Sequence, residues 1–431
     1  MKIKLNINSV FWILYFWMIA LPLHASNKIL TYLSVTGKIS VFHIALALIC
    51  IYLLLLNIRN GIRRLTKQKI IILAMGIGLL VSTVIGFKDR SHVFNNVIGD
   101  AVMYYMSFAI ILITTSRYFE VKSPKWILRT TFNALTINLI INVVMYFTRS
   151  WNFWGVYSYN GGRFGGGYLS LLVASVIYGV YDYLYEKSIK TPHLILHIGL
   201  ALFCSMLAQS RTHVILCFIG CLVLFIPLQK KMSKVYFVRA TVIAVIGIVG
   251  VAALLNGNSE LIQRILNMDV TSDTETTASR VITWTYYWRL IKQTPFGTGF
   301  GEILYFINPS MTRAMATATY YVDNAVAVVL YKGGWFFGAI YFLMVVTTPI
   351  GLVRCWRQTK DALYIVYAMV FTMLILSTMI LTSQVIHTYA INVFIWTTIG
   401  NVYNKDFETQ GAIKKGDEQY DKKMCAETAI Y

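Results

Sequence analysis

Charged residues are scarce in this chain of 431 residues, because Asp, Glu, Lys and Arg together make up only 13% of it. Soluble globular proteins carry about 25%, so this scarcity excludes an ordinary soluble domain. Apolar runs recur from end to end, and many are long enough to cross about 30 Å of hydrocarbon as a helix. Many short polar breaks separate these runs, which argues against the alternating strands of a β-barrel. We therefore predict an all-α, polytopic membrane protein.

Cysteines are also few, and none of the six has the spacing of a zinc site or a disulfide framework. The sequence lacks an Asp-x-Asp pair and a His-Glu pair that would hold a divalent cation. The first predicted outer loop, about 26–38, has no acidic residue. This pattern argues against metal-dependent membrane transferases that keep a catalytic acid in that loop. We expect no cofactor and no bound metal.

We predict twelve spans, which places both termini on the same side of the membrane. Residues 1–403 then form a single integral membrane domain that includes the long polar interruption at 256–333. The polar tail 404–431 is mixed in charge and is expected to be disordered. The predicted spans lie near 8–25, 39–57, 69–87, 97–116, 127–148, 166–185, 193–209, 212–229, 237–255, 334–353, 362–382 and 385–403.

The net charge of +20 would suggest a nucleic-acid partner in a soluble protein. Here we expect none, because the basic residues lie mostly in short loops. One set of loops and termini holds 25 of the 38 Lys and Arg residues; the other holds 13, of which six belong to 256–333. Lys and Arg concentrate in short cytoplasmic loops. Both termini and the 404–431 tail are therefore predicted to be cytoplasmic, and 256–333 is predicted to be an extracytoplasmic loop.

The 256–333 loop keeps its cations on the outer side against the usual bias, which suggests an anionic ligand there. These cations are Arg264, Arg280, Arg289, Lys292, Arg313 and Lys332. Three of them, Arg264, Arg313 and Lys332, have no motif around them. We expect those three only to tune the surface charge.

Two shorter outer turns also carry an arginine. Arg163 lies in the glycine-rich turn 157–167. Glycine lets backbone N–H groups approach an anion closely, and arginine adds a forked donor that suits phosphate; a flexible turn with one interfacial arginine is the alternative. Arg211 lies in the tight hairpin 210–212 between two predicted spans. It either reaches toward lipid headgroups or lies beside a lipid-linked substrate.

Residues 279–292 predict an amphipathic helix that lies on the membrane surface. At 100° per residue, Arg289 falls on the face opposite to Arg280. Trp284 and Trp288 suit the interface and also the stacking of sugars; a bare interfacial anchor is the alternative. The turn-rich segment 293–301 ends the helix. The face that includes Arg280 consists of Arg280, Trp284, Tyr287 and Ile291.

The segment Tyr320-Tyr321-Val-Asp323-Asn324 opens an apolar run that reaches Leu330. A carboxylate and an amide at the start of a half-buried helix would place a general base near the interface. The two residues could equally form a helix N-cap, which Asp and Asn favour, so both interpretations stay open. The tripeptide 332–334, Lys-Gly-Gly, breaks the run before the next span.

Four sequence elements, taken together in their order along the chain, resemble the O-antigen ligase and polymerase superfamily of bacterial envelope glycosyltransferases. They cover roughly residues 160–345, and the topology of the whole chain is similar. The elements are the Gly-Arg turn around Arg163, Ser210-Arg211-Thr212, the segment from Arg280 through Gly301, and Asp323-Asn324 through Gly338.

The resemblance implies a GT-C-like fold in the bacterial cytoplasmic membrane. It also implies transfer of a glycan from undecaprenyl diphosphate to an acceptor hydroxyl. Ligases commonly have a histidine before the asparagine, where this chain has Asp323. Polymerisation of repeat units, for O-antigen, capsule or exopolysaccharide, is therefore our first expectation, and ligation to lipid A core is the second. The implied partners are the lipid-linked oligosaccharide, an acceptor glycan, membrane lipid, a chain-length regulator and a flippase.

In such an enzyme, preorganised arginines stabilise the leaving diphosphate without a metal. We assign this role to Arg211 and Arg280, with Arg163 and Arg289 in support. Asp323 is the favoured general base, with Tyr320, Tyr321 or Glu302 as alternatives. The residues expected to contact the substrate are Arg163, Arg289, Trp284, Trp288, Tyr320, Tyr321 and Asn324.

Two other classes of protein remain to be distinguished. A flippase for lipid-linked oligosaccharides would also have about twelve spans, but it should carry charged residues inside those spans, lining a central cavity. A nonenzymatic scaffold of the envelope machinery would leave the arginine-rich loop unexplained.

Overall fold

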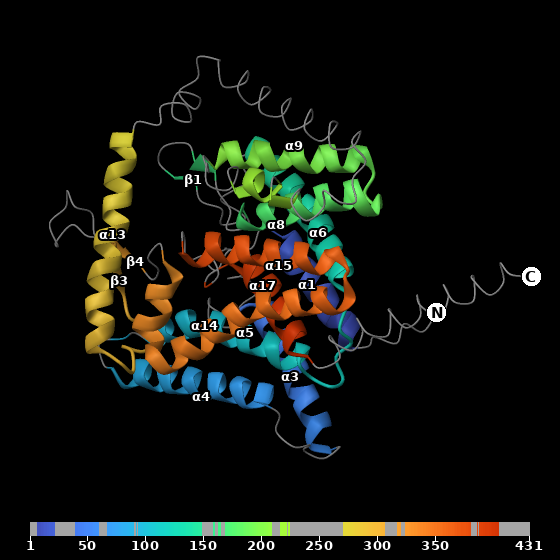
Figure 1. Cartoon of the computed structure of the whole chain (residues 1–431). Coiled ribbons are helices and arrows are strands. Elements are labelled where there is room, and N and C mark those ends of the chain that lie inside the picture. Colours follow the sequence, from blue (N-terminus) through green and yellow to red (C-terminus); the bar gives the residue numbers. More distant parts are fainter. Residues whose placement is uncertain are drawn as a thin grey trace, which may run out of the picture.

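A computed structural model shows the fold (Figure 1) and describes the chain in fifteen stretches. Predicted span 237–255 lies outside them. The described residues are 7–21, 39–59, 67–89, 92, 94–148, 158–159, 163–164, 169–208, 216–221, 223–224, 270–306, 317–319, 324–380, 386 and 388–404.

The described structure is overwhelmingly helical, with two short hairpins. Strand β1 (Ser158–Tyr159) pairs antiparallel with β2 (Arg163–Phe164), and β3 (Leu304–Phe306) pairs antiparallel with β4 (Thr317–Thr319). Two π-helical turns, η1 (Asp182–Glu186) and η3 (Leu376–Ile380), continue α8 and α15. The helices are α1 (Ile7–Ala20), α3 (Val41–Arg59), α4 (Lys67–Lys88), α5 (Phe94–Thr114), α6 (Pro124–Thr148), α8 (Leu169–Tyr181), α9 (Thr191–Leu207), α13 (Val270–Gln293), α14 (Ala325–Thr359), α15 (Ala362–Ile375) and α17 (Tyr389–Tyr403).

Five of the described helical segments are long and apolar enough to cross a membrane. Shorter apolar helices at Ile7–Ala20, Val41–Leu56 and Thr191–Ser205 accompany them. The prediction of an all-α, polytopic membrane protein is confirmed, whereas the count of twelve spans stays a prediction. The five segments are Gln68–Lys88, Phe94–Thr114, Pro124–Thr148, Ala325–Thr359 and Ala362–Met379.

The bundle has an enclosed centre and an apolar exterior. Every residue of α17 except Val402 is buried, so this helix occupies the enclosed centre of the bundle. It packs against α5, α1 and α14. By contrast, α4 exposes an apolar row at helical spacing, which suits contact with lipid tails. The row consists of Leu73, Ile77, Leu80 and Val84.

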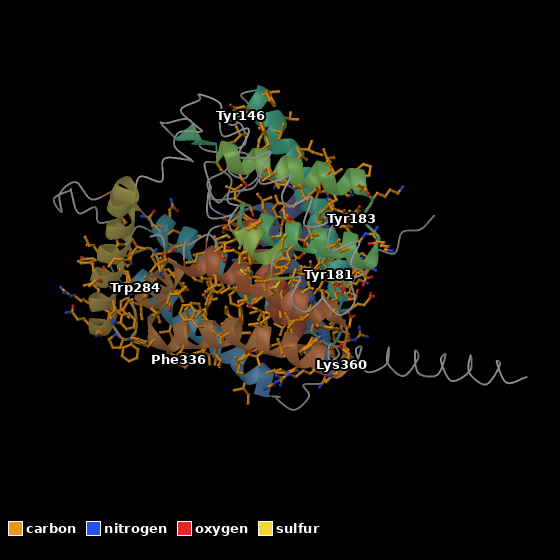
Figure 2. All side chains as sticks on the ribbon, turned by 45° about the horizontal axis from the view of Figure 1, so that its top comes forward. Tyr146, Tyr181, Tyr183, Trp284, Phe336 and Lys360 are labelled. Carbon is orange, nitrogen blue, oxygen red and sulfur yellow. The ribbon has the colours of Figure 1, made fainter. Side chains whose placement is uncertain are left out.

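Helix α13 differs from the others in direction, because it runs across the ends of α4 and α14 instead of alongside them (Figure 1). Trp284 of α13 and Phe336 of α14 lie at this end of the bundle, and Tyr181 and Lys360 lie at the opposite end (Figure 2). We call the end that carries α13 the α13 end. It is where the predicted motifs gather.

Candidate functional site

Helix α13 presents two different faces, as the periodicity predicted. Tyr287 and Ile291 are buried against the bundle, with exposed fractions of 2% and 0%. Arg289 lies on the opposite face and is exposed, together with Ile282 and Thr285. The predicted end of the helix at residue 293 is confirmed, whereas its start at Val270 is further upstream than residue 279. The side chain of Arg280 lies outside the described residues.

Aromatic rings join α13 to α14. The rings of Trp284 and Trp288 are stacked, with centroids 5.6 Å apart, and Trp288 meets the edge of Trp335 at 5.7 Å. Tyr287 contacts Tyr331 in the same way at 5.2 Å. Trp284 and Trp288 are half-buried, so part of each ring packs inside the protein and part remains accessible. Whether they also contact sugar stays a prediction.

Helix α14 is broken at Gly334, which has φ 74° and ψ 176°. The break was predicted at 332–334, and its cause is clear: glycine tolerates a positive φ that other residues resist. A break interrupts the helical ladder and leaves backbone groups without partners inside the helix. Buried groups of this kind need other partners.

Those partners come from residues 295–302, which we call the glycine turn. The N–H of Thr298 donates to the carbonyl of Tyr331 at 2.9 Å, and that of Gly299 donates to Lys332 at 3.0 Å. In return, the N–H of Trp335 donates to the carbonyl of Pro295 at 2.8 Å. Two motifs that are separate in the sequence therefore complete each other's backbone hydrogen bonds.

The glycine turn also lies against α4 and α5. The N–H of Phe300 donates to the carbonyl of Ser82 at 3.2 Å, and the hydroxyl of Ser82 donates to Gly333 at 3.2 Å. The turn approaches α4 so closely that a Cβ at Gly86 would overlap the backbone of Phe300. The turn thus fastens α13 to three helices of the bundle.

A buried ion pair lies beneath this turn. Lys332 Nζ is 2.5 Å from Asp100 Oδ2, and the exposed fractions of the two side chains are 0% and 1%. The same carboxylate oxygen accepts the N–H of Gly301 at 3.0 Å. The expectation that Lys332 tunes the surface charge is therefore wrong. Its counter-charge is Asp100, a residue of α5 far away in the sequence.

A second pair lies at the end of α4. His92 Nε2 is 2.5 Å from Glu302 Oε2; the histidine side chain is 3% exposed and that of Glu302 is 29% exposed. His92 Nδ1 lies 3.2 Å from the carbonyl of Gly86, and Asp89 Oδ2 lies 3.9 Å from Nε2. The second pair fixes the residue that ends the glycine turn.

The remaining predicted site residues are only partly located. Arg163 lies in β2, opposite Tyr159 of β1, and its side chain is not among those described. Asn324 is the N-cap of α14, and its Oδ1 accepts the N–H of Ala327 at 3.0 Å. The cap interpretation is thereby confirmed for Asn324, while its contact with substrate stays a prediction. Arg211, Asp323, Tyr320 and Tyr321 lie outside the described residues.

Two residues at this end were missed by the sequence analysis, namely Asp100 and His92. Asp100 carried a usable signal, because a carboxylate near the start of an otherwise apolar span needs a buried partner. Lys332, beside an apolar run, was the matching signal. His92 carried no such signal in the sequence, because a single histidine in a short loop is common.

Comparison with known families identifies part of this chain. Residues 196–343 match the Wzy_C family, described as O-antigen ligase. The match includes α13, the glycine turn and the broken start of α14, and it excludes Arg163. These residues form an O-antigen ligase family domain, of the type found in membrane glycosyltransferases that ligate or polymerise glycans. No curated protein matches the chain.

Proposed function

Starting from the O-antigen ligase family domain, we propose that this protein polymerises oligosaccharide repeat units linked to undecaprenyl diphosphate. The reaction takes place at the outer face of the bacterial cytoplasmic membrane. The observation that carries the proposal is that the family match includes the elements that form the α13 end, namely α13, the glycine turn and the start of α14. There the glycine turn and the broken α14 hold a helix bearing Arg280, Trp284 and Trp288 across the ends of the spans (Figure 1).

The proposed chemistry is a single displacement with inversion. The acceptor hydroxyl oxygen attacks the anomeric carbon, the bond from that carbon to the diphosphate oxygen breaks, and the hydroxyl proton passes to Asp323. Arg211 and Arg280 stabilise the charge that develops on the leaving diphosphate, with Arg163 and Arg289 in support. Removing one preorganised donor of this kind lowers kcat by about 100- to 1,000-fold in other enzymes.

The geometry of α13 supports a division between its two arginines. Arg289 is exposed on the face away from the bundle. Arg280 is nine residues earlier, which at 100° per residue places it on the face of Tyr287 and Ile291. That face lies against α14, so Arg280 is the better candidate for the diphosphate. Arg289 is better suited to a phosphate approaching from the membrane surface.

Ligation to lipid A core is the second candidate within the family. Asp323 favours polymerisation, because ligases commonly have a histidine at that place. A flippase is the candidate of another class. The described ion pair between Asp100 of α5 and Lys332 of α14 is almost fully buried. It therefore does not line the water-filled cavity that a flippase requires.

The test uses the purified protein in lipid nanodiscs with a lipid-diphosphate repeat unit. A ladder of products supports polymerisation, and a product formed only with a core acceptor supports ligation. Recovery of a retained anomeric linkage from a defined donor would contradict single-displacement inversion. Arg211→Ala and Arg280→Ala should each lower the transfer rate at least 100-fold, and Arg280→Lys should also impair it, because lysine lacks the forked donor. Full activity in both alanine variants would contradict the site assignment.

A further inference from the structure

Only one of the two carboxylate oxygens of Glu302 has a described hydrogen-bond partner. Its Oε2 lies 2.5 Å from His92 Nε2, and the N–H of the preceding residue, Gly301, is held by Asp100. Within the part of the chain that the structure describes, Oε1 has no hydrogen-bond partner. The side chain is 29% exposed. Glu302 is therefore a positioned acceptor with one oxygen available to a ligand.

The protonation of His92 follows from its two neighbours. The carbonyl oxygen of Gly86 only accepts hydrogen bonds, so His92 Nδ1 carries a proton toward it. The short contact between Nε2 and Oε2 then holds a second proton between the ring and the carboxylate. His92 and Glu302 together are therefore neutral, and the ring cannot turn without losing the bond to Gly86.

The local charge indicates which ligand fits this corner. Asp100 and Lys332 also neutralise each other, so the two described ion pairs leave no surplus cation here. The carboxylate of Asp89 lies 3.9 Å from His92 Nε2, and the exposed cation of Lys88 precedes it at the end of α4. The Glu302 carboxylate offers no donor to a diphosphate, whereas an uncharged sugar hydroxyl donates readily to a carboxylate oxygen.

Glu302 also lies beside the helix proposed to hold the donor. Strand β3 begins two residues after Glu302 and contacts α13. The Glu302 carboxylate lies within electrostatic reach of Tyr331, whose ring packs on Tyr287 of α13. An acceptor bound at Glu302 would thus lie at the α13 end of the bundle, close to the proposed transfer site.

We propose that Glu302 binds a hydroxyl of the acceptor glycan and that His92 is the positioning residue that holds its carboxylate. This assignment rests on the proposed function and divides the α13 end into two subsites. Arginines bind the diphosphate of the donor, and the Glu302 carboxylate held by His92 binds the uncharged acceptor. Because His92 and Asp100 fix the end of the glycine turn before any ligand arrives, little ordering remains when the acceptor binds.

The test measures the acceptor subsite separately from transfer. The probe is the oligosaccharide repeat unit released from its lipid, and its binding to the nanodisc-embedded protein is followed by saturation-transfer NMR. In parallel, the KM for this acceptor is measured at saturating lipid-linked donor. Loss of one hydrogen bond to a charged group should raise both Kd and KM for Glu302→Gln roughly 10- to 100-fold. The affinity for the lipid-diphosphate donor should stay unchanged.

Glu186→Gln is the matched control. Glu186 also has a partly exposed carboxylate, 32% accessible, in a 2.5 Å ion pair with Lys125. It lies beside Tyr181, at the end of the bundle opposite to α13 (Figure 2). This variant should bind donor and acceptor like the wild type. An equal loss in Glu186→Gln and Glu302→Gln would contradict the proposal, as would an unchanged acceptor affinity in Glu302→Gln.

The role of His92 has its own readout. His92→Gln should weaken acceptor binding in the wild-type background and have no further effect in the Glu302→Gln background, because it acts through Glu302. Additive losses would overturn the positioning role. If the wild type binds the glycan through Glu302 but transfers nothing, the proposed function fails while the subsite stands. If transfer proceeds with an acceptor KM insensitive to Glu302, the subsite fails while the function stands.

Discussion

Lys332 and Asp100 show how a buried ion pair can organise the α13 end. Two charges with 0% and 1% exposure are costly to remove from water unless each meets the other with good geometry. Asp100 Oδ2 meets both the ammonium group of Lys332 and the N–H of Gly301. The pair therefore links α5, the broken start of α14 and the glycine turn at one point.

Removing one partner of this pair should destabilise the protein more than removing both. Asp100→Asn keeps an oxygen for the N–H of Gly301 but leaves the Lys332 ammonium without its counter-ion. Lys332→Met leaves the Asp100 carboxylate without its counter-ion. Each single variant should lose about 3–5 kcal/mol of unfolding free energy. The double variant should recover a large part of that loss. Thermal unfolding of the detergent-solubilised protein measures the difference. Strictly additive losses in the double variant would show that the pair is not coupled.

At the residue scale, the sequence predicted what depends on local periodicity. The faces of Arg289 and Tyr287 followed from 100° per residue, and the α14 break followed from Gly334. The pairing of Lys332 with Asp100 was not predicted, because the partners are 232 residues apart and no local pattern connects them. His92 and Glu302, 210 residues apart, were missed for the same reason.

At the element scale, α5 and α17 approach each other closely at Thr114 and Gly400. A Cβ added at Gly400 of α17 would overlap the hydroxyl of Thr114 and lie 2.8 Å from its Cβ. That hydroxyl is committed to the carbonyl of Ile110 at 2.7 Å, so it cannot easily move aside. Small residues let membrane helices approach closely. Gly400 thus permits the enclosed position of α17.

Gly400→Ala should therefore destabilise the bundle, although alanine is the better helix former by about 1 kcal/mol. Overpacking in a close-packed interior typically costs about 1–3 kcal/mol. Gly199→Ala in α9 is the matched control, because nothing lies within 4 Å of a Cβ there. That variant should be as stable as the wild type or slightly more stable.

Thermal unfolding of both variants in the same detergent checks this prediction. Replacing Thr114 by Ala together with Gly400→Ala removes the overlapping hydroxyl and should restore part of the stability. Equal stability of Gly400→Ala and Gly199→Ala would contradict the packing that we describe between α5 and α17.

The boundaries of elements were predictable where glycine or proline marks them. The end of α13 and the break in α14 are examples. The start of α13 at Val270 was not predicted, because the upstream residues are polar and lack the aromatic periodicity of 279–292. Nor did the sequence indicate that the glycine turn completes the hydrogen bonds of α14, since that requires the two segments to meet in space.

At the scale of the whole molecule, the charge asymmetry predicts how the protein lies in the membrane. The loops assigned to the cytoplasm hold 25 basic residues, and the short outer loops hold seven. Two of the basic residues assigned to the cytoplasm lie at the same end of the bundle. Lys125 pairs with Glu186 there, and Lys360 lies at that end too (Figure 2). This end is opposite to α13. The asymmetry depends only on how many basic residues each set of loops contains, so it can be predicted without knowing any contact between residues.

The corresponding prediction concerns which end faces the outside. In a variant without its six cysteines, a single cysteine at Phe296, which is 74% exposed on the glycine turn, should react with a membrane-impermeant maleimide in intact cells. A cysteine at Lys190, exposed at the opposite end, should react only after the membrane is permeabilised. The difference arises because moving cationic loops across the membrane during insertion is disfavoured, so they remain in the cytoplasm.

Labelling of Lys190→Cys in intact cells, with Phe296→Cys labelled only after permeabilisation, would invert the predicted topology and also contradict the proposed function. It would place Arg280 and Glu302 on the cytoplasmic side, where a transferase that acts after export of its lipid-linked substrate cannot work. The Phe296 result therefore bears on the proposed function as strongly as the activity of the arginine variants does. A permeabilised sample labelled at both positions is the control, because it shows that each cysteine is accessible once the membrane no longer excludes the reagent.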